Sequence, residues 1–286
     1  MRQVTMYGAG FSEVYESCVR GVADARKSAE FSAAFAGLEA EGHRYEELAA
    51  RSDLYVIAAV KSSLNDVVRG ALTRKDLKEL YEVNMVGARK EARIHYDYIL
   101  LSPKYKKCPY CGLGQATTLD HYLPKSRFPQ FSVSVCNLVP SCRDCQSKKG
   151  RDYALHKSSQ TLHPYFDNPS FFNESWVKAE VVSGVATTIR FYVDPPGGWS
   201  LAMKSRVQAH FIAHELEKRF GIEAACELAA VNESLAELRS NGQFNEIKYL
   251  LSNRAVGYAR ECVNSWQSAL YAALAGNVWY CTSSVV

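Results

Sequence analysis

The sequence predicts an α+β protein that is mainly helical, with a cysteine-containing segment inserted between the helices and a small β-hairpin after that segment. Two helical patterns, over residues 11–100 and roughly 200–275, enclose a stretch of weak periodicity that contains two CxxC pairs. A short alternating pattern follows and predicts the hairpin. The predicted regions are residues 1–102 (helical), 103–168 (the inserted segment) and 169–286 (the hairpin and the C-terminal helices).

The first region reads as helices packed through apolar faces. Residues 29–53 are rich in Ala and Glu and predict helix, with a break near Gly42. Thr73 is suited to cap a long helix that runs toward Pro103. Apolar side chains at spacings of four and three define one face of this helix, which we expect to lie in the core: Leu77, Tyr81, Met85, Ala88, Ala92, Tyr96 and Ile99.

The inserted segment contains the predicted metal site. Residues 103–165 are rich in Pro, Gly, Ser and Cys and cannot build a large apolar core of their own. Cys108 and Cys111 form the first CxxC pair. Cys142 and Cys145 form the second, and the sulfur atoms of two such pairs converge on one ion. Four thiolates leave no open position, which predicts a structural zinc ion; buried free thiols or a redox-active pair are the alternatives.

The overall composition is that of a globular chain, with 47% hydrophobic and 22% charged residues. No apolar run approaches the length of a membrane span, and the first residues lack the apolar core of a secretory signal. Nine cysteines, four of them in CxxC pairs, suit metal binding in a reducing compartment better than disulfides. We therefore expect a cytoplasmic protein with no membrane partner. The remaining cysteines are expected to be buried: Cys18, Cys136, Cys226, Cys262 and Cys281.

The last region begins with the predicted hairpin. "WVKAEVV" (176–182) and "ATTIRFYV" (186–193) alternate around Ser183-Gly184. Residues 200–275 then predict three helices, separated near Gly221 and Asn241-Gly242. His210 and His214 stand four residues apart on the first of these helices, a spacing that can bind zinc. No third ligand stands out, and packing of the helix face is the favoured interpretation.

Positive charge is concentrated in the inserted segment. From Lys104 to Arg151, nine Lys and Arg side chains stand against two acidic ones, whereas the whole chain has a net charge of +4. Such a segment attracts a polyanion such as nucleic acid. A solvated basic loop is the alternative, but these charges surround candidate catalytic groups, which favours the polyanion.

Asp120 and His121 are those candidate groups. Adjacent residues of an extended segment point to opposite sides, so the two side chains can serve different tasks. A carboxylate can hold a hard cation such as Mg²⁺, and an imidazole can accept a proton from water near neutral pH. Asn137 and Gln146 add amides that can orient a ring or ligate a cation. This set suits phosphodiester hydrolysis, which needs an oriented base, a Lewis acid and cations for the phosphates.

The stretch "CPYCG … LDHYLPKSRFP … NLVPSCRDCQSKKG", over about residues 108–151, resembles the HNH endonuclease family, whose catalytic unit is a ββα-metal finger. Within that family it is similar to the HNH proteins of bacterial anti-phage systems, such as the nuclease subunit of Septu-type systems and related retron-associated effectors. "LHPYFDN" (162–168) and the hairpin extend the resemblance weakly. The resemblance implies that the inserted segment is such a finger, and it suggests a defence-system ATPase as a partner.

The resemblance also implies a role for each matching residue. His121 matches the general base that activates the attacking water. Asp120 matches the first ligand of a catalytic Mg²⁺ or Mn²⁺, and Asn137 matches the central Asn that steers the histidine and its loop. Gln146 stands where the family has Asn or His as the second metal ligand. It departs from the pattern, because its longer side chain could shift or weaken the bound cation.

Several cations are expected to contact nucleic acid. Lys149 matches the lysine of the family's trailing Lys-Gly pair and is expected on a phosphate. The other candidates for contacts with the phosphate backbone, which position a substrate without reading its sequence, are Lys125, Arg127, Lys148 and Arg151.

The sequence thus predicts a metal-dependent endonuclease, with DNA favoured over RNA or tRNA as its substrate and with activity restrained by a partner or a trigger. One alternative is a zinc-stabilised nucleic-acid-binding module that has lost catalysis, of which Gln146 would be the sign. Another is a redox CxxC protein without stoichiometric zinc.

Overall fold

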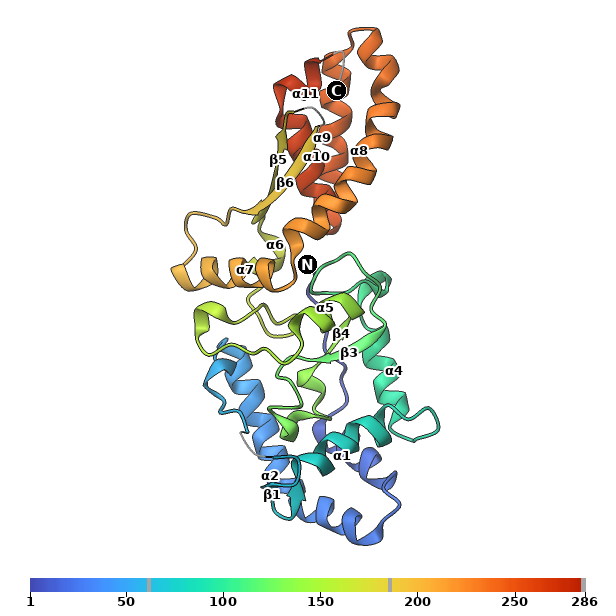
Figure 1. The fold of residues 1–286 in the computed structure, drawn as a ribbon, viewed down its shortest axis with the longest axis vertical. Helices are drawn as coiled ribbons and strands as arrows, with labels where there is room; N and C mark the ends of the chain where they lie inside the picture. Colours follow the sequence, from blue (N-terminus) through green and yellow to red (C-terminus); the bar gives the residue numbers. More distant parts are fainter. Residues whose placement is uncertain (61–62, 185–186, 284–286) are drawn as a thin grey trace. The chain divides into compact units, whose positions relative to one another are not determined.

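The computed structural model describes residues 1–60, 63–184 and 187–283. Most of these residues are helical, and the described strands form three two-stranded antiparallel sheets, β1–β2, β3–β4 and β5–β6 (Figure 1). The predicted α+β class with mainly helical content is therefore confirmed. Within the described residues, no helix combines the length and the apolar character that crossing a membrane requires.

The chain divides into two compact units. One unit is Arg2–Asp167, and the other is Asn168–Val286 together with Met1. The N-terminal helices and the cysteine-containing segment lie in the same unit. The division at residues 102/103 and 168/169 remains a prediction from sequence pattern.

The unit Arg2–Asp167 combines one long helix, α2, with many shorter elements. Its α-helices are α1 (Phe11–Arg20), α2 (Ala25–Ala50), α3 (Arg74–Glu79), α4 (Arg93–Leu101) and α5 (Arg143–Lys149). Its strands are β1 (Val67–Arg69), β2 (Leu72–Thr73), β3 (Thr118–His121) and β4 (Leu138–Ser141). A π-helical stretch covers Leu80–Met85, and 3-10 turns cover Leu54–Val56, Lys104–Lys106, Pro129–Phe131, Val135–Asn137 and Lys157–Ser159.

The predicted long helix starts where expected and is then interrupted. Thr73 caps α3 in a reciprocal pair: its hydroxyl oxygen accepts from the Asp76 N–H at 3.2 Å, and Oδ2 of Asp76 accepts from the Thr73 N–H at 2.8 Å. Residues 86–92 leave the helix, at a turn so tight that a Cβ on Gly87 would collide with the carbonyl four residues earlier. Of the predicted apolar face every member is buried except Ala88, which lies in this interruption.

The predicted break near Gly42 is wrong, because α2 runs through this residue. Gly42 is buried, and a Cβ there would lie 3.8 Å from the ring of Phe11 on α1. A glycine inside a helix costs about 1 kcal/mol relative to alanine. The packing of α1 against α2 and the Ala-rich remainder of the helix offset this small cost.

The apolar core of this unit joins the helices to the segment between the CxxC pairs. Buried side chains of α1, α2, α3 and α4 form one cluster with side chains of that segment: Leu119, Val133, Val135 and Leu138. The sequence predicted metal as the main support of residues 103–165. The structure adds a second support, which is a core shared with the N-terminal helices.

The unit Asn168–Val286 contains the predicted hairpin. β5 (Val177–Val182) and β6 (Thr188–Val193) pair antiparallel, which confirms the hairpin; residue 186 of the predicted second strand lies outside the described residues. The helices are α6 (Ser170–Asn173), α7 (Leu201–Ala213), α8 (Leu216–Ser240), α9 (Phe244–Glu261), α10 (Trp266–Gly276) and α11 (Val278–Thr282). β6 packs against α8, and β5 packs against α10.

The helix boundaries of this unit differ in part from the prediction. The break predicted near Gly221 is wrong: α8 runs through it, and the chain turns instead at Glu215, which has φ 48°. The break at Asn241-Gly242 is confirmed. Gly242 has φ 66°, a conformation that glycine adopts without strain.

Candidate active site and metal centre

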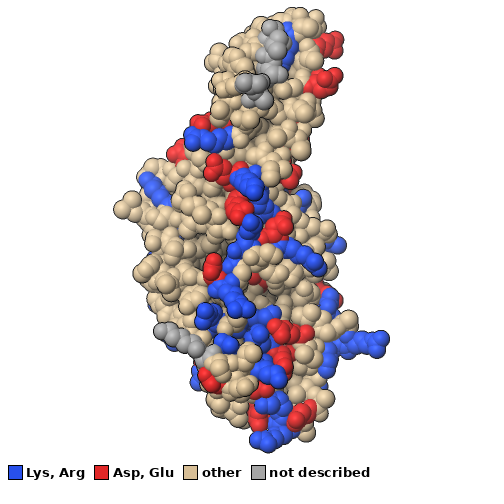
Figure 2. Space-filling model, viewed as in Figure 1, with Lys and Arg blue, Asp and Glu red and all other residues tan. Residues whose placement is uncertain are grey.

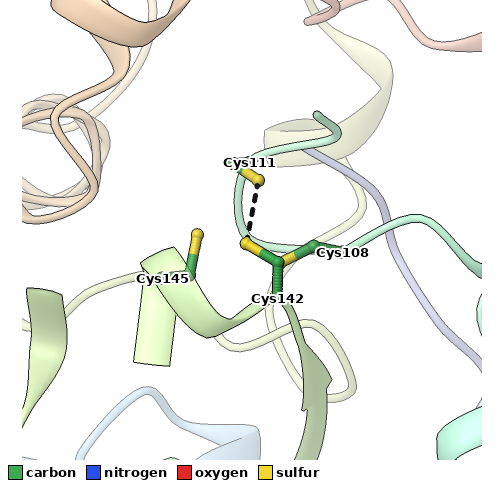
Figure 3. A group of neighbouring side chains, drawn as sticks. All are labelled: Cys108, Cys111, Cys142 and Cys145. Carbon is green, nitrogen blue, oxygen red and sulfur yellow. Dashed lines mark hydrogen bonds between the residues drawn. The ribbon is translucent and has the colours of Figure 1, made fainter. Parts of the chain in front are cut away.

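The four predicted zinc ligands converge. The Sγ atoms of Cys108, Cys111, Cys142 and Cys145 all lie within 4.8 Å of one another, and all four residues are buried (Figure 3). Sγ of Cys111 is 3.8 Å from Sγ of Cys142. This is much longer than a disulfide bond, and it matches the separation of about 3.8 Å between sulfur atoms in a zinc tetrahedron with bonds of about 2.3 Å. The four cysteines are positioned to bind one metal ion, and their geometry fits zinc.

Two glycines shape the first CxxC turn. Gly112, directly after Cys111, has φ 71° and donates its N–H to the carbonyl of Cys108 at 2.8 Å. Gly114 passes so close to Cys142 that a Cβ would lie 2.7 Å from the Cβ of that cysteine. The sequence CPYCGLG therefore has glycine where the backbone needs positive φ and where it approaches a ligand.

Without a metal ion the thiols of the cluster do not ionise alike. Burial raises the pKa of the Cys108 thiol. The pKa of Cys142 is lowered to about 6, because Cys108 donates a hydrogen bond to its sulfur. A metal ion would supply the positive charge that holds four thiolates in this buried place. Because four sulfur ligands leave no open position, such an ion would be structural.

The other cysteines lie apart from this cluster. Cys18, Cys136, Cys262 and Cys281 are buried as predicted. Cys226 is exposed, so the prediction of burial was wrong for this residue. It stands on α8 outside the row of buried side chains that runs through Ala224 and Leu228.

Strand β3 presents Asp120 and His121 to opposite sides, as the pleat of a strand requires. Both side chains are buried, with exposures of 4% for Asp120 and 6% for His121. β3 pairs with β4, and α5 begins directly after Cys142. Gln146 on α5 donates through Nε2 to the carbonyl of Leu119 at 3.1 Å. β3 and its neighbours β4 and α5 thus form the framework that carries the Asp-His pair (Figure 1).

His121 is held as a neutral imidazole. Its Nε2 lies 2.8 Å from the carbonyl oxygen of Ser132, and since a carbonyl can only accept, Nε2 carries the proton. Nδ1 therefore keeps its lone pair and has no hydrogen-bond partner among the described residues. The ring of Tyr81 packs edge-on, with centroids 4.5 Å apart. Burial lowers the pKa of His121 to about 3, and the positive charge of Lys125 acts in the same direction.

The carboxylate of Asp120 has two partners on one oxygen. The ammonium of Lys149 lies 3.1 Å from Oδ2, and the hydroxyl of Tyr110 donates to Oδ2 at 3.2 Å. Lys149 also donates to the carbonyl of His121 at 2.5 Å. Burial raises the pKa of Asp120, and the Lys149 charge opposes that shift. Lys149 was expected on a phosphate; it is instead 8% exposed and directed inward to a carboxylate.

Asn137 holds the loop that follows β3. Its Oδ1 accepts from the N–H of Leu123 at 2.7 Å, and its Nδ2 donates to the carbonyls of Leu123 at 3.0 Å and Phe131 at 3.3 Å. The end of this loop carries Ser132, whose carbonyl orients His121. Asn137 thus bonds to the loop that bears this carbonyl; its predicted steering of the histidine and its part in catalysis stay predictions.

A cation at Asp120 would meet an incomplete set of protein ligands. Among the described residues, His, Cys, Asp and Glu side chains converge in a group of three or more at the four cysteines alone. Besides Asp120, the amide of Gln146, water and substrate oxygens would have to complete the shell. The ammonium of Lys149, 3.1 Å from Oδ2, already balances the charge of Asp120. The carboxylate oxygen is the kind of donor that a hard cation prefers.

His163 is bonded within the interior through both ring nitrogens. It is 1% exposed, and its ring nitrogens contact the hydroxyl of Tyr45 and the N–H of Tyr165, at 3.2 and 3.3 Å. His210 and His214, also buried, have ring centroids 4.5 Å apart, but no third ligand joins them among the described residues.

Lys and Arg side chains gather on the surface of the unit Arg2–Asp167, with acidic side chains among them (Figure 2). Three of the predicted phosphate contacts are exposed: Arg127, Lys148 and Arg151. Lys125 is half-buried, with Nζ 3.3 Å from Oε1 of Glu82 and 4.7 Å from the ring centroid of Tyr81. It would have to exchange this carboxylate for a phosphate.

Three groups of the site were missed from the sequence. Tyr110 stands inside CPYC, and an aromatic residue between two metal ligands is the one signal that could have singled it out. Tyr81 was assigned to the core-facing side of a helix. It is buried as predicted, and its ring also packs against His121. Ser132 acts through its main-chain carbonyl, which no side-chain pattern reveals.

Over nearly its whole length the chain is similar to protein ea31 of Escherichia phage lambda, with 32% identity over 290 aligned residues that cover 97% of this chain and 98% of ea31. The chain belongs to the ea31 family. A second relative is Septu protein PtuB of Bacillus thuringiensis, which is 34% identical over 76 residues, or 25% of this chain and 29% of PtuB. No family model and no solved structure matches the chain. The similarity to PtuB agrees with the resemblance to Septu-type proteins over part of the sequence.

Proposed function

We propose that the chain is an HNH-type endonuclease that hydrolyses phosphodiester bonds of DNA, with His121 as the general base. The observation that carries the proposal is the hydrogen bond from Nε2 of His121 to the carbonyl of Ser132, which leaves Nδ1 as the basic nitrogen. The four-cysteine cluster and the partial similarity to PtuB support the choice of this family.

In this proposal Nδ1 of His121 takes a proton from the water molecule that attacks phosphorus. The Ser132 carbonyl keeps the ring in place and stabilises the imidazolium that forms, while Asn137 holds the loop on which that carbonyl lies. A pKa of about 3 makes His121 a weak base before substrate binds. A phosphate anion beside the ring would raise this pKa toward neutrality.

The negative charge of the substrate is met at several places. The exposed cations Arg127, Lys148 and Arg151 bind neighbouring phosphates and position the strand. Asp120, with the amide of Gln146 nearby, would hold Mg²⁺ or Mn²⁺. Such a cation would stabilise the charge that develops on the phosphate oxygens and on the leaving 3′-oxygen.

The biological role that we propose is defence against foreign nucleic acid, with activity restrained by a partner. The partial similarity to PtuB supports it, and an ATPase is the partner that this similarity suggests. Restraint is needed because an unregulated nuclease would cut the genome of its own cell.

A second candidate function is a zinc-stabilised module that binds nucleic acid without cutting it. Two observations favour it. The amide of Gln146 is already bonded to the strand through Nε2, and the carboxylate of Asp120 is already paired with Lys149.

The two functions are separated by incubating the full zinc-loaded chain with supercoiled plasmid, single-stranded DNA or RNA, in the presence of Mg²⁺ or Mn²⁺. Cation-dependent nicking of the plasmid that Asp120→Asn abolishes would support the endonuclease. The exposed His156 provides the control, since His156→Ala should keep the activity. Retarded migration of the nucleic acid without cleavage under both cations would support the binding module, and cleavage confined to RNA would overturn the choice of DNA.

A further inference from the structure

Lys149 is buried, and the proposed function does not explain why. It ends α5 in a segment rich in exposed cations, yet its side chain is 8% exposed. Its Nζ lies 3.1 Å from Oδ2 of Asp120 and donates to the carbonyl of His121 at 2.5 Å. The ammonium therefore stands where a cation bound to Oδ2 would stand.

With the side chains in these positions, the ammonium of Lys149 and a divalent cation cannot both contact Oδ2 of Asp120. Oxygen ligands of Mg²⁺ lie at about 2.1 Å, so an ion on Oδ2 would be within a few ångströms of the ammonium of Lys149. The two like charges would repel each other, and burial of the pair limits screening by water and salt. Tyr110 approaches Oδ2 as well, at 3.2 Å, which further restricts the room around that oxygen.

The position of Lys149 in the chain gives it a route out of the site. It is the last residue of α5, and Gly150 ends the helix with φ 54°. Residues 150–152 are exposed. A lysine side chain has a long flexible stem, so rotation about its own bonds can carry the ammonium to the surface without moving the strand. There it would join Lys148 and Arg151.

We propose that Lys149 is a gate for the divalent cation: its ammonium is the internal counter-ion of Asp120 and must withdraw before Mg²⁺ or Mn²⁺ can bind there. This inference rests on the proposed function of the site. It makes Lys149 a counter-ion in the resting protein and a phosphate ligand once it is displaced. An anionic substrate then promotes cation binding, because it offers the displaced ammonium a new partner.

The gate is tested by direct titration of Mn²⁺ into the zinc-loaded full chain without nucleic acid, with free Mn²⁺ read from its electron paramagnetic resonance signal. Lys149→Met keeps an unbranched side chain, one atom shorter, and removes its charge. We expect it to bind Mn²⁺ about tenfold more tightly than the unaltered chain, since it no longer competes for Asp120. The control Lys148→Met removes the same charge from the exposed neighbour on α5 and should stay within about twofold of the unaltered chain. Equal or weaker Mn²⁺ binding by Lys149→Met would overturn the proposal.

A second measurement needs no variant and so does not depend on Lys149→Met folding. Acetylation of the unaltered chain, followed by mass spectrometry, should modify Lys149 slowly and modify it several-fold faster when Mg²⁺ is added, with Lys148 unchanged. A rate at Lys149 that ignores Mg²⁺ would contradict the gate. Neither readout involves cleavage. A gate that behaves as expected in a chain that cuts nothing would therefore reject the proposed function alone.

Discussion

The hydroxyl of Tyr110 donates a hydrogen bond to Oδ2 of Asp120 across 3.2 Å. Tyr110 stands between Cys108 and Cys111 of the cysteine cluster, and it is fully buried. One side chain therefore connects the cysteine cluster to the carboxylate of the candidate active site.

Removing this hydroxyl tests the connection. Tyr110→Phe deletes one hydrogen bond to a buried carboxylate, so we expect the free energy of unfolding to fall by roughly 1–3 kcal/mol. Urea unfolding of the zinc-loaded chain measures it. The control Tyr105→Phe, at an exposed tyrosine of the same segment, should change the value by less than about 0.5 kcal/mol. Equal stabilities for the two variants would mean that the Tyr110 contact contributes nothing.

Metal content tests the cysteine cluster. The purified chain should carry one zinc ion, and Cys142→Ser should lose it and unfold at a lower temperature, because the buried thiols then lack their common counter-ion. Elemental analysis and a thermal melt provide the two readouts. Cys226→Ser, which alters an exposed cysteine outside the cluster, should retain both zinc and stability. A disulfide among the four cysteines, or zinc retained by Cys142→Ser, would contradict the site.

The buried imidazole makes stability depend on pH. The folded pKa of His121 is about 3, below the value of about 6.5 in an unfolded chain, so the unfolded chain binds the proton more readily. The contribution of His121 is complete above about pH 6.5 and is lost as the pH falls toward 3. Between pH 7 and 5 this loss should be roughly 2 kcal/mol. Burial raises the pKa of Asp120, so this group makes the folded chain more stable as the pH falls. The unaltered chain and the two histidine variants described next all contain Asp120.

The comparison isolates the histidine. His121→Asn should show a flatter dependence of unfolding free energy on pH from 7 to 5, whereas His156→Asn, at an exposed position, should follow the unaltered chain. Parallel curves for all three proteins would rule out a buried neutral His121.

Asn137 should control the loop that carries the Ser132 carbonyl. Asn137→Asp replaces a donor with an acceptor that faces the carbonyls of Leu123 and Phe131, so we expect a loss of at least about 2 kcal/mol. Amide exchange across residues 123–132 should become faster in this variant. Asn253→Asp adds the same charge at an exposed helix position and should alter neither quantity. Unchanged exchange in Asn137→Asp would show that the loop is held by other contacts.

Features set by neighbours in sequence were predicted well. The CxxC spacing places two sulfur atoms on one turn, and Thr73 with Asp76 forms a cap within four residues. The hairpin and the break at Gly242 have equally local causes. Local signals failed where packing decides: Gly42 was predicted to break a helix, but it lies against Phe11 inside α2.

The candidate site was predictable in its residues and less so in its contacts. The sequence brings Asp120, His121 and Asn137 into one segment, and the structure places all three in the interior around β3. The pairing of Lys149 with Asp120 spans two elements, and sequence charge indicated only a surface cation. Burial of an ammonium beside a carboxylate depends on how α5 packs on β3, and spacing carries no signal for that.

The most direct measurement of the central claim is the rate at which the full chain nicks supercoiled plasmid in Mn²⁺, compared with that of His121→Ala under saturating protein. The account predicts a rate at least about 100-fold lower for His121→Ala, with DNA binding retained, because the base is lost while the basic surface stays. Nicking at the same rate in both proteins would contradict it.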